Sequence, residues 1–144
     1  MEYQNLIITR ISGQANEEDV TRWENSLQTA LNQVPDNSVF KIMVDLHGFK
    51  AVNFEVHKKF RVIIPKTLAD YHWRVGYLDL FPEAEIELKQ TRGIRCVAAV
   101  HVHHDETKIR AYDQNHSRYN ERFFTDPVMA RQWIEDFNVT AQVS

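Results

Sequence analysis

The chain has 144 residues, of which 43% are apolar and 26% are charged, and its formal net charge is -3 at pH 7. This length and composition fit one globular domain with a hydrophobic core, and they exclude a disordered or low-complexity chain. The weakly negative charge offers no basic field for nucleic acid. The single cysteine, Cys96, excludes an internal disulfide framework and a Cys-rich zinc finger.

The N-terminal segment, MEYQNLIITRISG, lacks the basic region and apolar stretch of a secretory signal. No run in the sequence approaches the roughly 20 apolar residues that a membrane-spanning helix needs. We therefore expect a soluble, cytoplasmic protein of bacterial type with no membrane span.

The first third of the chain predicts a strand, a helix and a second strand. Residues Asn5–Gly13 are β-branched and end in glycine, which is typical of a strand. Asn16 can cap a helix of about 18 residues, because three acids follow it and favour the positive helix end. An apolar stripe at helical spacing continues to Val34. The nearly continuous apolar run Val39–Leu46 predicts a strand buried on both faces, as in a parallel sheet.

The middle of the chain predicts a second helix and a third strand. Asn53 can cap the helix, which extends through Leu68 with a kink expected at Pro65. Trp73–Phe81 has the apolar character of a strand. Pro82–Gly93 fits either a short helix after the proline or an alternating strand, and the sequence does not decide between them.

The last third predicts two further strands and two helices. Ile94–Val102 is expected to be a central strand, and Asp105–Glu121 is a polar segment of helical character with an N-cap at its first residue. Arg122–Asp126 predicts a short edge strand. Asp126–Phe137 predicts a helix, since a capping aspartate precedes a proline at the first helical position. Residues 138–144 are expected to be a loose tail.

Strands alternate with amphipathic helices along the whole chain, and the sequence contains no internal repeat or linker. This alternation is typical of α/β proteins. We predict one α/β domain over residues 1–137, with a mainly parallel or mixed sheet of four to five strands flanked by about four helices.

Three segments carry a resemblance to a known family: KIMVDLHGF, CVAAVHVHHD and RFFTDPVMARQWI. Their order resembles the SpoIIAA-like branch of the STAS domains, the sulfate-transporter and anti-sigma-factor-antagonist fold. Many members of that branch end in an aromatic-x-D-x-x-x-A-x-x-W segment, which Phe123–Trp133 matches loosely. The resemblance implies a STAS-like fold and a small regulatory or ligand-binding module.

The chain departs from that family at one functional position. In anti-sigma-factor antagonists a phosphorylatable serine opens the helix that follows the strand of the VDL type, which here lies in KIMVDLHGF. The corresponding turn here, Phe49–Phe54, contains no serine or threonine. The resemblance therefore carries over no phosphoacceptor, and no partner switching controlled by a kinase.

Histidines follow two of the predicted strands. His101 and His103 share one face of their strand, and His47 follows the end of another. Ligands of open α/β sheets bind outside the carboxyl ends of the strands. We therefore predict a ligand-binding crevice at this end of the sheet, formed by His47, Gly48, Phe49, His101, His103 and Asp105.

A metal site is the alternative interpretation of the same histidines. Imidazoles at His47, His101 and His103, with Asp45 or Asp105, could coordinate zinc, and His104 and His116 are reserves. No independent zinc motif such as H-E-x-x-H or C-x-x-C is present. The simplest interpretation is that the strand ends in solvent and that His104 and the following acids begin a helix.

Other polar and reactive residues are ambiguous in the sequence. A basic face on the second helix is either solvated or contacts an acidic partner or an anionic head group; it comprises His57, Lys58, Lys59, Arg61 and Lys66. Cys96 is expected to be a core residue rather than a nucleophile. Four further side chains line the crevice or an outer helix face: Tyr112, Arg118, Tyr119 and Arg122.

The leading functional prediction is a non-enzymatic STAS-like module that binds a protein partner or a small, even lipidic, ligand. No catalytic residue is assigned, since the sequence has no Walker A, G-x-G-x-x-G or G-x-S-x-G motif. The alternative is a small metal-binding enzyme or sensor that uses His47, His101 and His103. A third hypothesis is a structural homodimer subunit.

Overall fold

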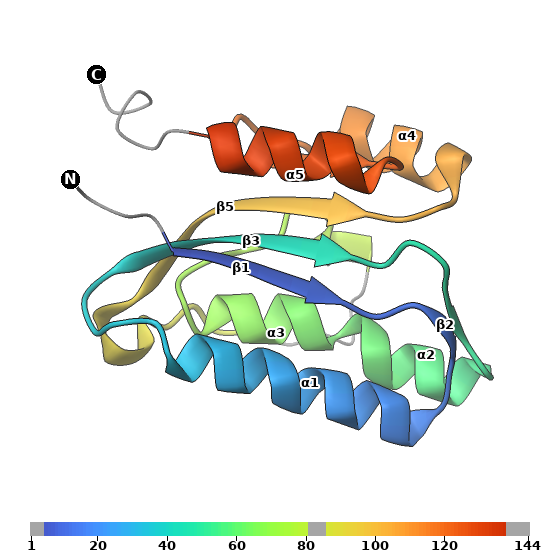
Figure 1. Ribbon diagram of the computed structural model, residues 1–144, viewed down its shortest axis with the longest axis horizontal. Helices are drawn as coiled ribbons and strands as arrows, with labels where there is room; N and C mark the ends of the chain where they lie inside the picture. The colour runs from blue at the N-terminus through green and yellow to red at the C-terminus, as the bar shows by residue number, and fades with distance from the viewer. Residues whose placement is uncertain (1–4, 81–85, 138–144) are drawn as a thin grey trace.

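A four-stranded parallel sheet forms the middle layer of the structure, and helices cover both of its faces (Figure 1). This computed structural model describes residues 5–80 and 86–137. The strands are β1 (Asn5–Arg10), β3 (Val39–Asp45), β5 (Arg95–Val102) and β6 (Glu121–Phe124). They lie in the order β1-β3-β5-β6, and each neighbouring pair is parallel. The predictions of an α/β fold, a central strand β5 and an edge strand β6 are confirmed.

Three helices cover one face of the sheet: α1 (Glu17–Asn32), α2 (Phe54–Arg61) and α3 (Ile63–Ala69) (Figure 1). The predicted cap of α1 is present, because the Asn16 side chain accepts from the backbone of Asp19 while the Asp19 carboxylate accepts from the Asn16 backbone. This reciprocal pair satisfies two of the amides that a helix start leaves open.

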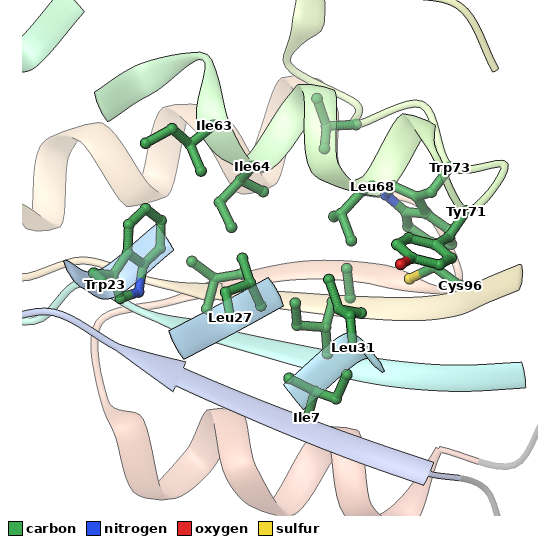
Figure 2. Close-up of a cluster of buried hydrophobic side chains, with 14 of the residues drawn as sticks. Ile7, Trp23, Leu27, Leu31, Ile63, Ile64, Leu68, Tyr71, Trp73 and Cys96 are labelled. Atoms are coloured by element: carbon green, nitrogen blue, oxygen red, sulfur yellow. The ribbon is translucent and has the colours of Figure 1, made fainter. Parts of the chain in front are cut away.

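The larger hydrophobic core lies between these helices and the sheet (Figure 2). Leu27 and Leu31 of α1 and Leu68 of α3 are each no more than 1% exposed. Burying one such side chain contributes roughly 1.5–3 kcal/mol. Cys96 of β5 lies at the edge of the same cluster (Figure 2), which confirms that it is a core residue.

Two helices cover the other face: α4 (Glu106–His116) and α5 (Pro127–Asp136). Asp126 caps α5 by accepting from the backbone of Val128, and Pro127 occupies the first helical position as predicted. Ala130 and Ile134 of α5 are fully buried against the sheet and form a second, smaller core with Val100. Both faces of the central strands are therefore covered, which explains their continuous apolar sequences.

The predicted strand Trp73–Phe81 is wrong over its described residues. It is a turn followed by a short 3₁₀ helix, η1 (Leu78–Leu80), and Phe81 lies outside the described part of the chain. Its apolar side chains Trp73, Val75 and Leu78 are buried in the larger core from this loop. Their alternation of apolar and polar residues resembles that of a strand, but it results from burial in the core and not from hydrogen bonding to a neighbouring strand.

Pro82–Gly93 is described only from residue 86. Residues 86–89 form neither helix nor strand, and a 3₁₀ turn, η2 (Thr91–Gly93), precedes β5. An isolated antiparallel bridge joins Gln90 to Tyr71. Neither the helix nor the strand expected in this segment is present among its described residues, and 82–85 lie outside them.

Two helix boundaries and one small sheet differ from the prediction. The second helix breaks into α2 and α3 at Val62, three residues before Pro65, because the proline has no amide to donate to Arg61. The segment after Asp105 leaves the helix at His116, five residues before Glu121. The chain also forms a second, two-stranded parallel sheet that the sequence did not indicate, from β2 (Gly13–Ala15) and β4 (Phe49–Ala51).

Candidate functional site

A cavity of about 80 Å³ lies at the carboxyl ends of β3 and β5, between α2 and α4. Its walls are mainly aliphatic and aromatic, and include Val44, Ile64, Tyr77, Ile109, Tyr112 and Phe123. A wider hollow of about 340 Å³ adjoins it and reaches Phe49, Lys50 and Phe54. The two share five lining residues: Leu46, His57, Phe60, His103 and Lys108. We call the pair the strand-end cavity, with an inner and an outer part.

The strand-end cavity lies at the end of the sheet where the sequence predicted a crevice. His101 and His103 line its inner part, and Phe49 lines its outer part. His47 and Gly48 are not among the described residues that line either part. They belong to the loop between β3 and β4, which forms part of the surrounding structure.

Two loops beside the cavity are joined by hydrogen bonds to histidine rings. Gly48 N donates to Nδ1 of His104 at 3.0 Å, which ties the β3–β4 loop to the β5–α4 loop. Asp105 N donates to Nδ1 of His103, also at 3.0 Å, and the Asp105 carboxylate caps α4 through the backbone of Lys108. The rings of His103 and His104 stack with centroids 4.3 Å apart. Gly48, His104 and Asp105 fix the loops and are not among the described lining residues, whereas His103 also lines both parts of the cavity.

The proposed metal ligands do not converge. Over residues 5–80 and 86–137, no three or more His, Cys, Asp or Glu side chains are grouped so that they could hold a metal ion. Nε2 of His101 is engaged with Glu121, and Asp45 forms an ion pair with Arg10 at 2.9 Å. His116, one of the two reserve ligands, packs against Tyr112 with ring centroids 5.5 Å apart. The zinc site stays a prediction.

A buried ionic network lies behind the inner cavity and reaches its wall through His101. Glu121, at the start of β6, is completely buried, and its carboxylate lies 2.8 Å from Nε2 of His101. It also accepts from Arg118 at 2.6 Å and from the backbone of Gly76 at 2.9 Å. Although burial raises the pKa of Glu121, the hydrogen bond and charge of His101 and the charge of Arg118 hold it below its usual value.

An ionised Glu121 fixes the orientation of the His101 ring. A carboxylate only accepts hydrogen bonds, so Nε2 of His101 carries the hydrogen in this pair. The ring also stacks on Phe123 at 4.8 Å between centroids, and meets the edge of Tyr77 at 5.4 Å. His101 is therefore a rigid wall residue. The sequence reasoning missed Glu121, although an acid beginning an apolar strand was a visible signal.

One lysine and two imidazole side chains line the junction of the inner and outer parts. Burial and the charges of Lys108 and Arg61 lower the pKa of His57. Burial, the charge of Lys108 and neighbouring histidines lower the pKa of His103 to about 4. Burial also lowers the pKa of Lys108, against the opposing effect of Asp105. The lowered pKa values favour neutral imidazoles at pH 7, which leaves Lys108 as the cation among the described residues that line both parts.

The comparisons with known proteins identify no relative: no family model, no curated protein and no solved structure matches the chain. The fold therefore defines the class only as α/β with a parallel sheet, and the STAS resemblance stays a prediction. Asn53 caps α2 by accepting from the backbone of Val56. Within the described ranges, no helix has both the length and the apolar character needed to cross a membrane.

Proposed function

We propose that this protein is a non-enzymatic, STAS-like ligand-binding module that holds a small apolar or lipidic ligand in the strand-end cavity. The observation that carries the proposal is the inner cavity itself, whose aliphatic and aromatic walls open into a wider hollow. Concave, mainly apolar pockets with a few polar groups are typical of ligand sites, and the carboxyl ends of parallel strands are their usual place.

The chemistry of the lining favours binding over catalysis. Its described residues include no serine, threonine or cysteine that could act as a nucleophile. The His101 imidazole is held by Glu121, whose remaining lone pairs are occupied by Arg118 and Gly76. Burial raises the pKa of the Tyr77 phenol, which keeps that hydroxyl protonated at neutral pH. The walls thus offer shape and fixed polar groups.

A titration with 1-octanol, followed by amide chemical shifts in NMR, tests the proposal. We expect saturable binding with shifts concentrated at residues of β3, β5 and α4 that line the cavity. The variant Ile109→Trp fills the inner part, since Ile109 is buried in its wall, and should weaken binding about tenfold or more.

A matched control places the same bulk elsewhere. Val128→Trp adds an indole on α5, where Val128 is 74% exposed and outside the cavity. Its affinity for 1-octanol should equal that of the parent. Absence of saturable binding to the parent, or equal affinities for Ile109→Trp and the parent, would contradict the proposed function.

A further inference from the structure

The strand-end cavity has an uneven charge that an apolar ligand alone does not explain. Lys108, His57 and His103 line both of its parts, Arg61 lines the inner part, and Lys50 lines the outer part. None of the described lining residues is an aspartate or glutamate, although the whole chain has 20 acids against 17 lysines and arginines. The cavity is therefore locally positive in a protein of negative net charge.

Within the described part of the chain, no carboxylate forms an ion pair with the ammonium group of Lys108. No described residue accepts a hydrogen bond from its Nζ, which lies 5.6 Å from the centre of the Tyr112 ring. The nearby carboxylate of Asp105 is engaged with the backbone amide of Lys108 as the cap of α4. The ammonium is thus half-buried beside an aromatic ring, at the point where the inner and outer parts meet.

A lysine of α2, on the other side of the cavity, is paired and so differs from Lys108. Lys59 of α2 donates to Oγ1 of Thr21 at 2.8 Å and pairs with Glu17 at 3.4 Å. Desolvating a cation without a counter-ion has a free-energy cost, whereas pairing it in a site of low dielectric constant recovers that cost. Lys108 is the cation of the junction that an incoming anion can neutralise.

We infer that the ligand is an amphipathic monoanion, whose apolar body lies in the strand-end cavity and whose compact head, such as a carboxylate, binds Lys108 beside His57. The inference rests on the proposed function and adds the charge and orientation of the ligand. The ammonium of Lys108 supplies one charge, and the imidazole of His57 supplies a ring nitrogen at the same junction. Hydrogen bonds from a charged donor to a carboxylate are the strong ones, and they set orientation as well as affinity.

Octanoate and 1-octanol provide the test, because they share a chain and differ in the charge of the head. In NMR titrations at about pH 7.5, where octanoate is ionised, we expect the parent to bind octanoate about tenfold or more tightly than 1-octanol. Lys108→Met should weaken octanoate binding more than 1-octanol binding, so that the two affinities fall within about twofold of each other. Lys59→Met, the paired control, should keep the parent's preference.

The outcomes separate this inference from the proposed function. Equal affinities of the parent for octanoate and 1-octanol would overturn the inference and leave the function standing, and so would an unchanged preference in Lys108→Met. Failure of the parent to bind either compound would overturn the proposed function. If Lys108→Met does not fold, the parent's own preference for octanoate over 1-octanol decides whether the ligand is an anion. Lys108→Arg, which retains the charge, should keep that preference.

Discussion

Removal of the Glu121 carboxylate is the most severe single test of the buried network. Glu121 has no exposed surface and accepts four hydrogen bonds, two from Arg118 and one each from His101 and Gly76. Replacing it by alanine removes all four acceptor contacts at once. Neither His101 nor the Gly76 amide gains a described replacement partner, so the donors are left beside an apolar gap.

The expected loss follows from what is left behind. An unsatisfied buried donor such as the Gly76 amide costs about 1–3 kcal/mol. Breaking a buried ion pair by removing one partner costs about 3–5 kcal/mol in total. Because Arg118 is 42% exposed at its side chain, water can solvate it and reduce its share. We therefore expect Glu121→Ala to lower the free energy of unfolding by about 3–4 kcal/mol, and Glu121→Gln by about half as much, since the amide keeps one acceptor.

Urea denaturation followed by far-UV circular dichroism measures this loss. The matched control is Glu106→Ala, which removes an ion pair with Arg110 whose side chains are 78% and 67% exposed. Such a surface pair is worth about 0.5 kcal/mol or less. A loss for Glu121→Ala within about 1 kcal/mol of the control would refute the view that this network stabilises the fold.

Two further predictions concern pH and glycine. Burial and neighbouring positive charges lower the pKa of His103 to about 4, below the 6.5 of an ordinary histidine, so stability should rise with pH between these values. After a discount for partial exposure, we expect about 1 kcal/mol less stability at pH 5 than at pH 8 in urea titrations. His103→Asn should reduce this difference, and an equal slope in both proteins would contradict the assignment. In thermal melts, Gly76→Ala should lose more stability than Gly13→Ala. A Cβ at residue 76 would lie 2.2 Å from the His116 carbonyl oxygen, whereas a Cβ at residue 13 meets open space and is strained only by the backbone φ of +74°. The reverse order would show that the loop before η1 moves to accommodate the added methyl group.

Much of the fold could be predicted because local signals and tertiary packing agree. The cap at Asn16 and the proline at residue 127 begin helices in the structure as they do in the sequence. The run Val39–Leu46 indicated burial on both faces, and β3 has helices on both sides. Where helix caps, apolar pattern and tertiary burial all favour the same element, a single sequence is enough to predict it.

The prediction failed where burial did not follow secondary structure. Trp73 and Val75 are as buried as strand residues, yet they belong to a loop. Period and composition cannot separate a buried loop from a short strand, since both show apolar residues at every second position. The pair of β2 and β4 was missed for the opposite reason, because three-residue strands such as Gly13–Ala15 have too few positions to show a pattern.

The sequence indicated the end of the sheet where the cavity lies, but it did not indicate all of the residues that form the cavity and its surroundings. Position along a strand indicated His101 and His103, which do line the cavity. The partner of His101 is Glu121, 20 residues later in the chain, and only the parallel pairing of β5 with β6 brings them together. Lys108 was missed because nothing in its local sequence shows that α4 turns this side chain toward His57 rather than toward solvent.

The positive charge in the cavity also illustrates why the net charge of a chain is a poor guide to the charge of its ligand. A charge of -3 spread over the chain describes the field at long range, where a Debye length of about 8 Å screens each group from distant ones. Inside the strand-end cavity the distances are shorter and the screening is weaker, so Lys108 and a described lining without acids determine the potential that a ligand meets. If octanoate is preferred over 1-octanol, raising the salt concentration should reduce that preference only modestly, because the ammonium is half-buried. A preference abolished by moderate salt would instead assign the anion to exposed lysines such as Lys50, at the outer rim.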